Sequence, residues 1–272
     1  MLTRLGKYLL LERLGRGGMS EVHRAKNLLD GGIVALKLLL PRDEIFIDLV
    51  GEKKLRDIFF AEARTMAGLQ HECIAGIIES GEIDDILYIA LEYVPRSLGS
   101  IIGDSTRIEV TRILGTSLTC DYLRQTLCCL DAVHGAGLVH RDIKPDNLMI
   151  TERDQVKLID FGLCKTAGNE EMVIPGMQIG SPFYTAPEQE HDPAAADERA
   201  DLFSAGVIAY RLLTGRLINH RQGKIAAASR FNADLTKQWD QFLFKGVHKE
   251  RSKRFQSARA MRLHLEDICR SV

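Results

Sequence analysis

Residues 140–147 read His-Arg-Asp-Ile-Lys-Pro-Asp-Asn, and Asp-Phe-Gly follows at residues 160–162. Asp142 can accept a proton from an attacking hydroxyl group, and Lys144 can neutralise phosphoryl oxygens. Side-chain oxygen atoms are the ligands that Mg²⁺ prefers, and this stretch offers two such side chains, Asn147 and Asp160. The four residues together predict the transfer of a phosphoryl group from ATP.

This pattern is far more specific than any of its residues taken alone. A single aspartate such as Asp142 is more often a turn or cap residue than a catalytic base. Asn147 lies five positions later, across a loop from Asp142, and adds a second functional group to the same site. A metal ion bound by so few protein ligands would bridge phosphate groups rather than sit in a protein cage.

The composition allows one large core or two lobes of ordinary domain size, and we expect two. The chain has 272 residues and a net charge of −1, so no overall field favours nucleic acid or an acidic lipid surface as a partner. Lys37 and Arg211 interrupt the most apolar stretches before they reach the length of a membrane span. We therefore expect a cytoplasmic protein with no membrane segment within this chain, while an anchor outside it stays open.

The six cysteines predict reduced thiols. They form no Cys-x-x-Cys pair, and no histidine stands at a spacing suited to zinc. Reduced thiols are the rule in the cytosol. The residues concerned are Cys73, Cys120, Cys128, Cys129, Cys164 and Cys269.

The first ninety-odd residues predict a small sheet with one helix. Short apolar runs near glycines, such as 33–36 and 86–91, are typical of strands. Phe59, Ala63 and Met66 recur at helical spacing and predict an apolar stripe that packs on the sheet. After Pro95 the spacing of apolar residues is helical, so a second, mainly α-helical lobe follows.

Three helices of the second lobe can be placed from their apolar stripes and end signals. Gly135 and Gly137 end the first, Gly215 ends the second, and Ser257 is a suitable N-cap for the third. We expect the second helix to lie deep in the core. The stripes are Leu123, Leu127, Leu130 and Val133; Leu202, Ala205, Ala209 and Leu212, preceded by Asp201; and Ala258, Met261, Leu265 and Ile268.

A glycine-rich segment and one lysine of the first lobe are candidates for binding phosphate groups. Gly15, Gly17 and Gly18 lie between two strand-like runs, where small residues let backbone N–H groups approach a triphosphate. Such a hairpin is more often only a turn, and Ser20 stands where the phosphate-binding pattern has a third glycine. Lys37 follows in a buried strand, although a solvated lysine on an edge strand is the alternative.

Glu62 is the expected partner of Lys37, because the stripe of its helix directs it inward, unlike Glu44 and Glu52. The carboxylate would hold the lysine against the α- and β-phosphates, the alternative being a solvated helix carboxylate. The end of the last strand is the expected adenine site. Its residues are Leu91, Glu92 and Val94, whose backbone would face the adenine edge, with Val22, Ala35 and Leu91 beside the ring.

The motifs resemble those of a eukaryotic-type (Hanks-type) protein serine/threonine kinase, and their residues are most similar to those of bacterial members. The resemblance implies an α+β fold of two lobes. Residues 1–94 would form a small antiparallel β lobe with one helix that binds ATP, and residues 95–272 a larger, mainly α-helical lobe for catalysis and substrate. ATP with Mg²⁺, or with Mn²⁺ in its place, would be the cofactor. The matching segments are 14–19, 34–37, 140–147, 160–162, 180–188, 201–206 and 254–258.

The resemblance also implies roles and a substrate class. Glu188 would pair with Arg254, and Asp201 would hold the backbone of the His140-Arg141 turn. The order Lys144-Pro145-Asp146 is the form seen in serine/threonine kinases. The expected partners are therefore proteins that offer Ser or Thr hydroxyl groups, this chain included.

Arg141 predicts regulation by phosphorylation, because an arginine beside the catalytic aspartate marks kinases whose activation loop is ordered by a phosphate group. Thr166 is the expected acceptor, and Ser181 and Thr185 are less favoured. Ser181 stands where the family usually has a threonine that helps to align the substrate. Mass spectrometry of segment 163–185 after incubation with ATP and Mg²⁺ tests this expectation.

Two other functions stay open from the sequence alone. A pseudokinase, which binds nucleotide or a partner with little turnover, would account for Ser20 and for loop segments of unusual length. A small-molecule phosphotransferase would share both lobes, but it would not need segment 180–188, which resembles a platform for an extended peptide. Turnover of labelled ATP into protein distinguishes a protein kinase from both.

Overall fold

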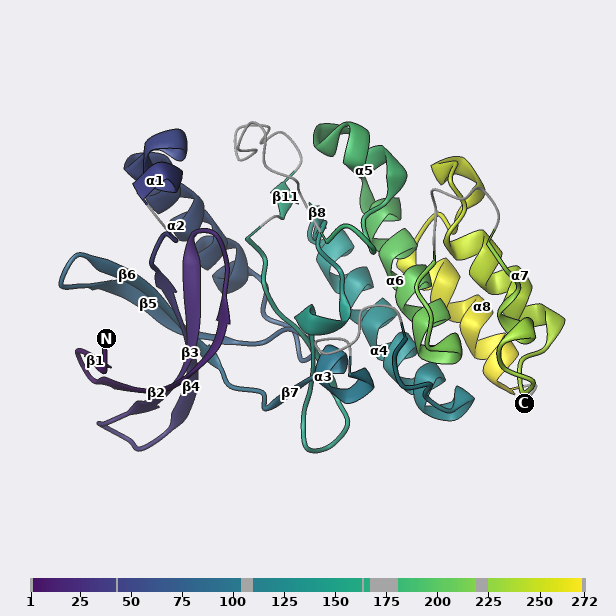
Figure 1. The fold of residues 1–272 in the computed structure, drawn as a ribbon, viewed down its shortest axis with the longest axis horizontal. Coiled ribbons are helices and arrows are strands. Elements are labelled where there is room, and N and C mark those ends of the chain that lie inside the picture. The colour runs from purple at the N-terminus through teal and green to yellow at the C-terminus, as the bar shows by residue number, and fades with distance from the viewer. Residues whose placement is uncertain are drawn as a thin grey trace. The chain divides into compact units, whose positions relative to one another are not determined.

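A computed structural model describes residues 2–42, 44–103, 110–162, 164–166, 181–218 and 225–270. The chain divides into two compact units, Met1–Val94 and Pro95–Val272 (Figure 1). One antiparallel sheet dominates the first unit, and helices dominate the second. The fold class is therefore the two-lobed α+β arrangement that the sequence predicts.

The sheet of the first unit has six strands in the order β1-β2-β3-β4-β6-β5, and all neighbours are antiparallel. One set of side chains forms its core: Leu5, Tyr8, Ala25, Val34, Leu36, Leu38, Tyr88 and Ala90. Because successive side chains of a strand point to opposite faces, Ala35 and Lys37 lie on the other face of β4. The strands are β1 (Arg4–Leu5), β2 (Tyr8–Arg16), β3 (Ser20–Asn27), β4 (Ile33–Leu39), β5 (Ile77–Ile83) and β6 (Ile86–Glu92).

The helix predicted in the first unit is α2 (Glu52–Gly68), and it buries Phe59, Ala63 and Met66 as expected. A shorter helix, α1 (Glu44–Val50), precedes it and was not indicated by the sequence pattern. Gly51 separates the two with a φ of +86°, a left-handed conformation that glycine adopts without a steric penalty. The chain therefore turns at Gly51, and the segment before α2 forms a second, separate helix.

The second unit is organised around α6, in which every residue from Ala200 to Thr214 is buried. This confirms the prediction that the helix lies deep in the core. The other helices are α3 (Leu98–Ile102), α4 (Thr116–Gly135), α5 (Pro187–His191), α7 (Lys237–Gly246) and α8 (Ala258–Arg270), and α6 spans Glu198–Thr214. Short 3-10 helices are η1 (Pro145–Asn147), η2 (Pro193–Ala195), η4 (Ala228–Arg230) and η5 (Arg251–Lys253). The strands are β7 (Arg96–Ser97), β8 (Leu138–Val139), β9 (Leu148–Ile150), β10 (Val156–Leu158) and β11 (Lys165–Thr166).

Most of the predicted helix ends are confirmed. Gly137 and Gly215 have left-handed backbones just after α4 and α6, with φ values of +73° and +67°. The Ser257 Oγ accepts a hydrogen bond from the N–H group of Ala260 at 3.1 Å, as an N-cap does. At the start of α6 the cap is Asp197, whose side chain accepts from the N–H group of Arg199 at 3.0 Å. Asp201 therefore lies inside the helix.

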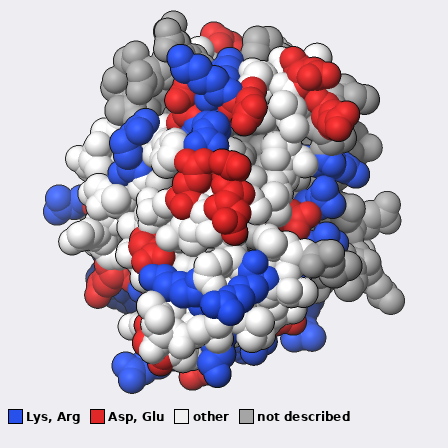
Figure 2. Space-filling model, turned by 90° about the vertical axis from the view of Figure 1, so that its left-hand side faces the viewer, with Lys and Arg blue, Asp and Glu red and all other residues white. Residues whose placement is uncertain are grey.

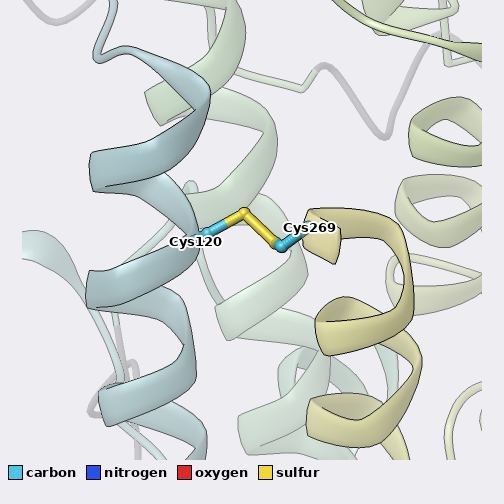
Figure 3. Close-up of a disulfide and its surroundings, with 2 residues drawn as sticks. All are labelled: Cys120 and Cys269. Carbon is cyan, nitrogen blue, oxygen red and sulfur yellow. A yellow bond between two sulfur atoms is a disulfide. The ribbon is translucent and has the colours of Figure 1, made fainter. Parts of the chain in front are cut away.

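Cys120 of α4 and Cys269 of α8 form a disulfide, with Cα atoms 6.4 Å apart (Figure 3). The expectation of six reduced thiols is wrong for this pair. The two cysteines are 149 positions apart, and only the packing of α4 on α8 brings them together, so sequence spacing gives no signal. Cys73, Cys128, Cys129 and Cys164 are not part of any disulfide.

The surface carries charges of both signs, in keeping with the net charge of −1. Figure 2 shows Lys and Arg interspersed with Asp and Glu on the face that it presents, with uncharged surface between them. Within the part of the chain that the structure describes, none of the helices combines the length and the hydropathy needed to cross a bilayer.

Candidate active site

A hairpin and a short loop position the motif residues of the second unit. Segment 140–147 leads from β8 into η1, and β9 follows at once. In the β9–β10 pair Leu148 lies opposite Leu158, and just beyond it the Ile159 N–H group donates to the Asn147 carbonyl at 3.0 Å. Asp160 therefore follows at the same end of the hairpin as Asn147, although thirteen positions separate them in the sequence.

The carboxylate of Asp142 is the centre of a hydrogen-bond network, and the residue is only 7% exposed. Lys144 Nζ donates to Oδ2 at 2.7 Å, and Ser181 Oγ donates to Oδ1 at 3.2 Å. Asn147 Nδ2 donates to Oδ2 at 3.1 Å and to the Asp142 carbonyl at 2.8 Å. Because its amide nitrogen faces Asp142, the side-chain oxygen of Asn147 is the atom that it can offer to a metal ion.

Two residues of the site hold backbone conformations that L side chains rarely adopt. Arg141 and Asp160 have φ values of +65° and +64°, and such a conformation costs roughly 1–2 kcal/mol per residue. Hydrogen bonds hold Arg141 in place: its N–H group donates to Asp201 Oδ1 at 2.8 Å, and its carbonyl accepts from Gln189 Nε2 at 2.7 Å. Strain of this kind is typical of functional loops that the surrounding structure fixes.

Asp201 fixes the turn as the resemblance implies. Its Oδ2 also accepts from the His140 N–H group at 2.9 Å and from His134 Nε2 at 2.9 Å. Burial by itself would raise the pKa of Asp201, but the hydrogen bond from His134, with the nearby His140, lowers the pKa below its ordinary value of 3.8. The carboxylate is therefore ionised inside the folded unit.

This ionisation makes the stability of the second unit depend on pH. A lowered folded-state pKa means that Asp201 contributes its full stabilisation above the ordinary value of 3.8, and that this contribution is lost as the pH falls toward the folded-state pKa. At neutral pH, Asp201→Asn should lose about 1.5–3 kcal/mol for each charged hydrogen bond that weakens. Urea unfolding of both forms should show a constant difference from neutral pH to about pH 5, and a shrinking one below about pH 4. A difference that persists unchanged into that acid range would contradict the assignment.

Lys37 and Glu62 form a buried ion pair in the first unit. Lys37 Nζ donates to the two carboxylate oxygens of Glu62 at 2.6 and 2.8 Å, and both residues are buried. Helix α2 supplies the carboxylate from the stripe that the sequence indicates, and β4 supplies the lysine. Glu62, not Glu44 or Glu52, is therefore the partner of this lysine, and the alternative of two solvated side chains is excluded.

The strand register aligns the predicted adenine and phosphate residues on one face of the sheet. Val22 of β3 lies opposite Lys37 of β4, and Gly15 of β2 lies opposite Val22. Ala35 lies opposite Leu91 of β6. Since partners across a ladder and residues two apart point to the same side, the four side chains of Val22, Ala35, Lys37 and Leu91 share a face.

The glycine segment closes a tight turn between β2 and β3. The Gly17 N–H group donates to the Ser20 carbonyl at 2.8 Å, and the Gly18 carbonyl accepts from the N–H group of Arg42 at 2.9 Å. Ser20 is buried at the start of β3, and its φ is not in the left-handed region. Serine at this position is therefore free of the backbone strain that would have favoured a glycine.

At the end of β6, Glu92 forms two hydrogen bonds with Gly76 of the same unit. Its N–H group donates to the Gly76 carbonyl at 2.8 Å, and its side chain accepts from the Gly76 N–H group at 3.2 Å. Val94, two residues later, is buried. The Glu92 N–H group is thus already used within the first unit, and the adenine site at the end of β6 stays a prediction.

The predicted phosphorylation sites differ in their surroundings. Thr166 lies in β11, but its side chain is outside the described residues. Thr185 is buried and donates to the Ser181 carbonyl at 2.8 Å, and Ser181 contacts Asp142. Arg141 is also buried, and burial lowers the pKa of its guanidinium while Cys164 and Asp201 act in the opposite direction. Phosphorylation of this segment stays a prediction.

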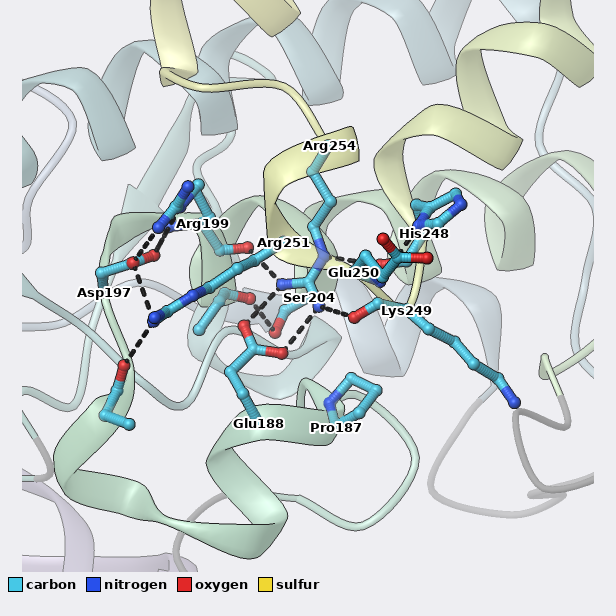
Figure 4. A network of polar contacts seen from close by, with 12 residues as sticks. Pro187, Glu188, Asp197, Arg199, Ser204, His248, Lys249, Glu250, Arg251 and Arg254 are labelled. Carbon is cyan, nitrogen blue, oxygen red and sulfur yellow. Dashed lines mark hydrogen bonds and ion pairs between the residues drawn. The ribbon is translucent and has the colours of Figure 1, made fainter.

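Glu188 and Arg254 form the ion pair that the resemblance implies (Figure 4). The Arg254 Nη1 and Nη2 atoms donate to the two carboxylate oxygens of Glu188 at 2.6 and 2.7 Å. The same guanidinium also donates to backbone carbonyls, those of Arg199, His248 and Lys249. One side chain thereby links α5, the first turn of α6 and the segment before η5.

Two residues that support the site were missed in the sequence. His134 lies in the last turn of α4 and donates to Asp201, and Gln189 lies in α5 and donates to the carbonyl of Arg141. These two hydrogen bonds join residues that are 67 and 48 positions apart in the sequence. Neither belongs to a local pattern, so only the tertiary structure reveals them.

Comparison with known proteins agrees with this geometry. Residues 8–265 match the protein kinase domain family. The chain is 36% identical to the serine/threonine-protein kinase PksC of Streptomyces coelicolor, over 94% of this chain and 48% of the relative. It is 34% identical to a probable serine/threonine-protein kinase of the same organism, over 96% of this chain and 40% of the relative. The chain thus spans less than half the length of these two relatives.

The solved structures include the PknI kinase domain of Mycobacterium tuberculosis, which superposes with a TM-score of 0.72 at 26% identity. The superposition covers 97% of this chain and 96% of the PknI domain. The family match, the bacterial relatives and this fold agree with the Asp142 network and the Lys37–Glu62 pair. The chain therefore belongs to the protein kinase family and is a kinase domain of the bacterial serine/threonine type.

Proposed function

We propose that this chain transfers the γ-phosphoryl group of ATP to Ser and Thr hydroxyl groups of proteins, itself included. The observation that carries the proposal is the Asp142 carboxylate: its Oδ1 accepts a hydrogen bond from the Ser181 hydroxyl group, and its Oδ2 accepts from Lys144 and Asn147. A carboxylate that accepts a hydrogen bond from a hydroxyl group and lies beside an ammonium group has the arrangement that acceptor activation requires.

Each residue has a distinct role in this proposal. Asp142 orients the acceptor hydroxyl and takes its proton, and Lys144 neutralises the oxygens of the transferring group. Lys37, held by Glu62, contacts the α- and β-phosphates. The first unit thus serves nucleotide binding, and the second serves catalysis and the protein substrate.

Asn147 and Asp160 are the proposed metal ligands. They offer one amide oxygen and one carboxylate, a donor set that suits Mg²⁺ when phosphate oxygens complete the coordination. Mg²⁺ bound with ATP supplies neutralisation of charge on the phosphate oxygens. Mn²⁺ accepts the same oxygen ligands and is a second candidate.

The proposed setting is the cytoplasm, where ATP and Mg²⁺ are available, and the proposed partners are proteins. The near-neutral net charge gives no electrostatic reason for nucleic acid as a partner. Within the activation segment we favour Thr166 as the phosphate acceptor, because Thr185 is buried and Ser181 is already engaged with Asp142.

The acceptor class distinguishes this function from a small-molecule phosphotransferase. The purified chain should be incubated with γ-labelled ATP and Mg²⁺, with a mixed protein substrate in one arm and with free serine, sugars and choline in the other. We expect label in phosphoserine and phosphothreonine of protein after acid hydrolysis, and no label when a chelator removes the metal. Label only in the small molecules would overturn the proposal.

Lys37→Met should lower kcat/KM for ATP by about 10- to 150-fold, the kinetic equivalent of losing one charge-assisted hydrogen bond of about 1.5–3 kcal/mol. The measurement is steady-state phosphorylation of a protein substrate at varied ATP. Lys26→Met is the matched control, because Lys26 is an exposed lysine of the neighbouring strand β3. It should retain wild-type kinetics.

A second variant separates this effect from misfolding. Lys37→Met alone leaves the Glu62 carboxylate buried without its ammonium partner, which destabilises the unit. Adding Glu62→Gln removes that charge and should restore the melting temperature without restoring activity. Recovery of activity in the double variant would show that Lys37 acts only on stability.

A further inference from the structure

The Cys120–Cys269 disulfide joins two helix ends in the second unit. Cys120 lies in the second turn of α4, and Cys269 is the last but one residue of α8 (Figure 3). Both cysteines are half-buried, so neither residue is enclosed in the core. An accessible disulfide can be reached by small thiols, in contrast to one enclosed in a core.

Buried residues next to the two cysteines, Thr119 on α4 and Ile268 on α8, also hold these helix ends in the unit. The N-cap of α4 is Gly115, and it makes no side-chain cap hydrogen bond among the described residues. On α8 the buried stripe ends at Ile268, while Arg270 in the last turn is 73% exposed. Arg270 pairs with Glu266 and Asp267 at 3.9 Å, within the same helix. Beyond the buried Ile268, the disulfide at Cys269 is the covalent tie between the last turn of α8 and α4.

The position of α4 gives this tie a functional consequence. Helix α4 leads directly into β8 and then into the loop that holds Asp142, and its residue His134 donates to Asp201. A bond that closes 149 positions of chain also limits the freedom of the unfolded state. Oxidation should therefore stabilise the unit that carries the catalytic loop, and reduction should loosen it from the α8 end.

We propose that Cys120 and Cys269 form a reversible redox clasp, which opens and closes by exchange with small disulfides and thiols such as glutathione. In closing, the thiolate of one cysteine attacks the small disulfide, forms a mixed disulfide and releases one small thiol. The second cysteine thiolate then displaces the other small thiol and forms the protein disulfide. One small disulfide is reduced to two thiols while two protein thiols, having released two protons, are oxidised to one disulfide.

The proposed cytoplasmic setting favours a clasp of this kind over a permanent structural bond. In the cytosol of most organisms, thiol systems keep cysteines reduced, and the disulfides that do occur are mostly transient, catalytic or redox-sensing. The inference rests on that setting but not on the identity of the substrate. Its test reads stability and thiol state, so that its failure is distinguishable from failure of the proposed kinase activity.

The test equilibrates the purified chain in reduced or oxidised glutathione, counts free thiols by mass spectrometry after alkylation, and measures thermal unfolding and hydrogen exchange. We expect the bond to form and to be reduced reversibly, with a melting temperature roughly 4–16 °C higher in the oxidised form. Exchange across residues 262–270 should be faster in the reduced form, because the end of α8 opens locally.

Three variants make the test specific. Cys120→Ser and Cys269→Ser should each abolish the redox dependence of the melting temperature. Cys128→Ser should keep it, since Cys128 is an exposed cysteine of the same helix outside the disulfide. If a serine variant does not fold, the wild-type chain in its two redox states provides the comparison. Absence of the bond in oxidised glutathione, resistance to excess thiol, or equal melting temperatures of the two forms would each overturn the proposal.

Discussion

Asp142→Asn is expected to lower kcat for protein phosphorylation on the order of 10²–10⁴-fold, the usual contribution of a positioned general base. Asparagine keeps the size of the side chain but cannot take a proton from the acceptor hydroxyl. It also weakens the bond from Lys144 Nζ, which donates to this carboxylate at 2.7 Å. The loss should appear mainly in kcat, because Asp142 acts on the reacting hydroxyl and not on the nucleotide.

The control for this variant is Asp234→Asn, which changes an exposed aspartate of the same unit. It should keep wild-type kcat, and both variants should bind ATP with Mg²⁺ as the wild type does. Wild-type turnover by Asp142→Asn would remove Asp142 from its catalytic role. Lost ATP binding by this variant would instead assign the residue to the nucleotide site.

Arg254→Leu is expected to destabilise the second unit by about 3–5 kcal/mol, because it leaves a partly buried carboxylate without its cation. The Arg254 side chain is fully buried and that of Glu188 is 17% exposed. Three backbone carbonyls lose a donor in the same substitution. The melting temperature should fall by roughly 6–20 °C, measured by calorimetry or by circular dichroism.

The neighbouring lysine supplies the matched control. Lys253 pairs with Glu250 at 2.7 Å, but both side chains are more than half exposed, so Lys253→Leu should leave the melting temperature nearly unchanged. Arg254→Lys should give an intermediate value, because one ammonium group cannot replace the two-pronged contact of a guanidinium. Equal melting temperatures for Arg254→Leu and Lys253→Leu would show that the Glu188 pair contributes little.

Local patterns in the sequence were sufficient for the fold class and for several elements. The stripes of α2, α4, α6 and α8 are buried as predicted, since helical periodicity reports which face is covered. The pairing of Lys37 with Glu62 could be predicted because Lys37 interrupts the apolar run of a strand and Glu62 lies beside the apolar stripe of a helix. The roles of these residues in catalysis stay predictions until they are measured.

Other features depend on contacts that no local pattern encodes. Helix α1 was not predicted, because it lies in a charged segment without a clear apolar stripe. The left-handed Gly51 separates it from α2. The Cys120–Cys269 bond joins residues 149 positions apart and depends on how α8 packs on α4. His134 likewise contacts Asp201, which holds the His140-Arg141 turn, and Gln189 contacts the Arg141 carbonyl, in both cases through long-range hydrogen bonds.

Phosphoryl transfer itself is the most direct measurement of the proposed function. The purified wild-type chain and Asp142→Asn should be incubated with ATP, Mg²⁺ and a protein substrate, and then analysed by intact-protein and peptide mass spectrometry. With the wild type we expect mass increases of one or more phosphate groups, located on Ser and Thr residues. Without Mg²⁺, or with Asp142→Asn, this phosphorylation should be lost. A wild-type chain that binds ATP with Mg²⁺ and yet transfers no phosphate to any protein would contradict the assignment of an active kinase.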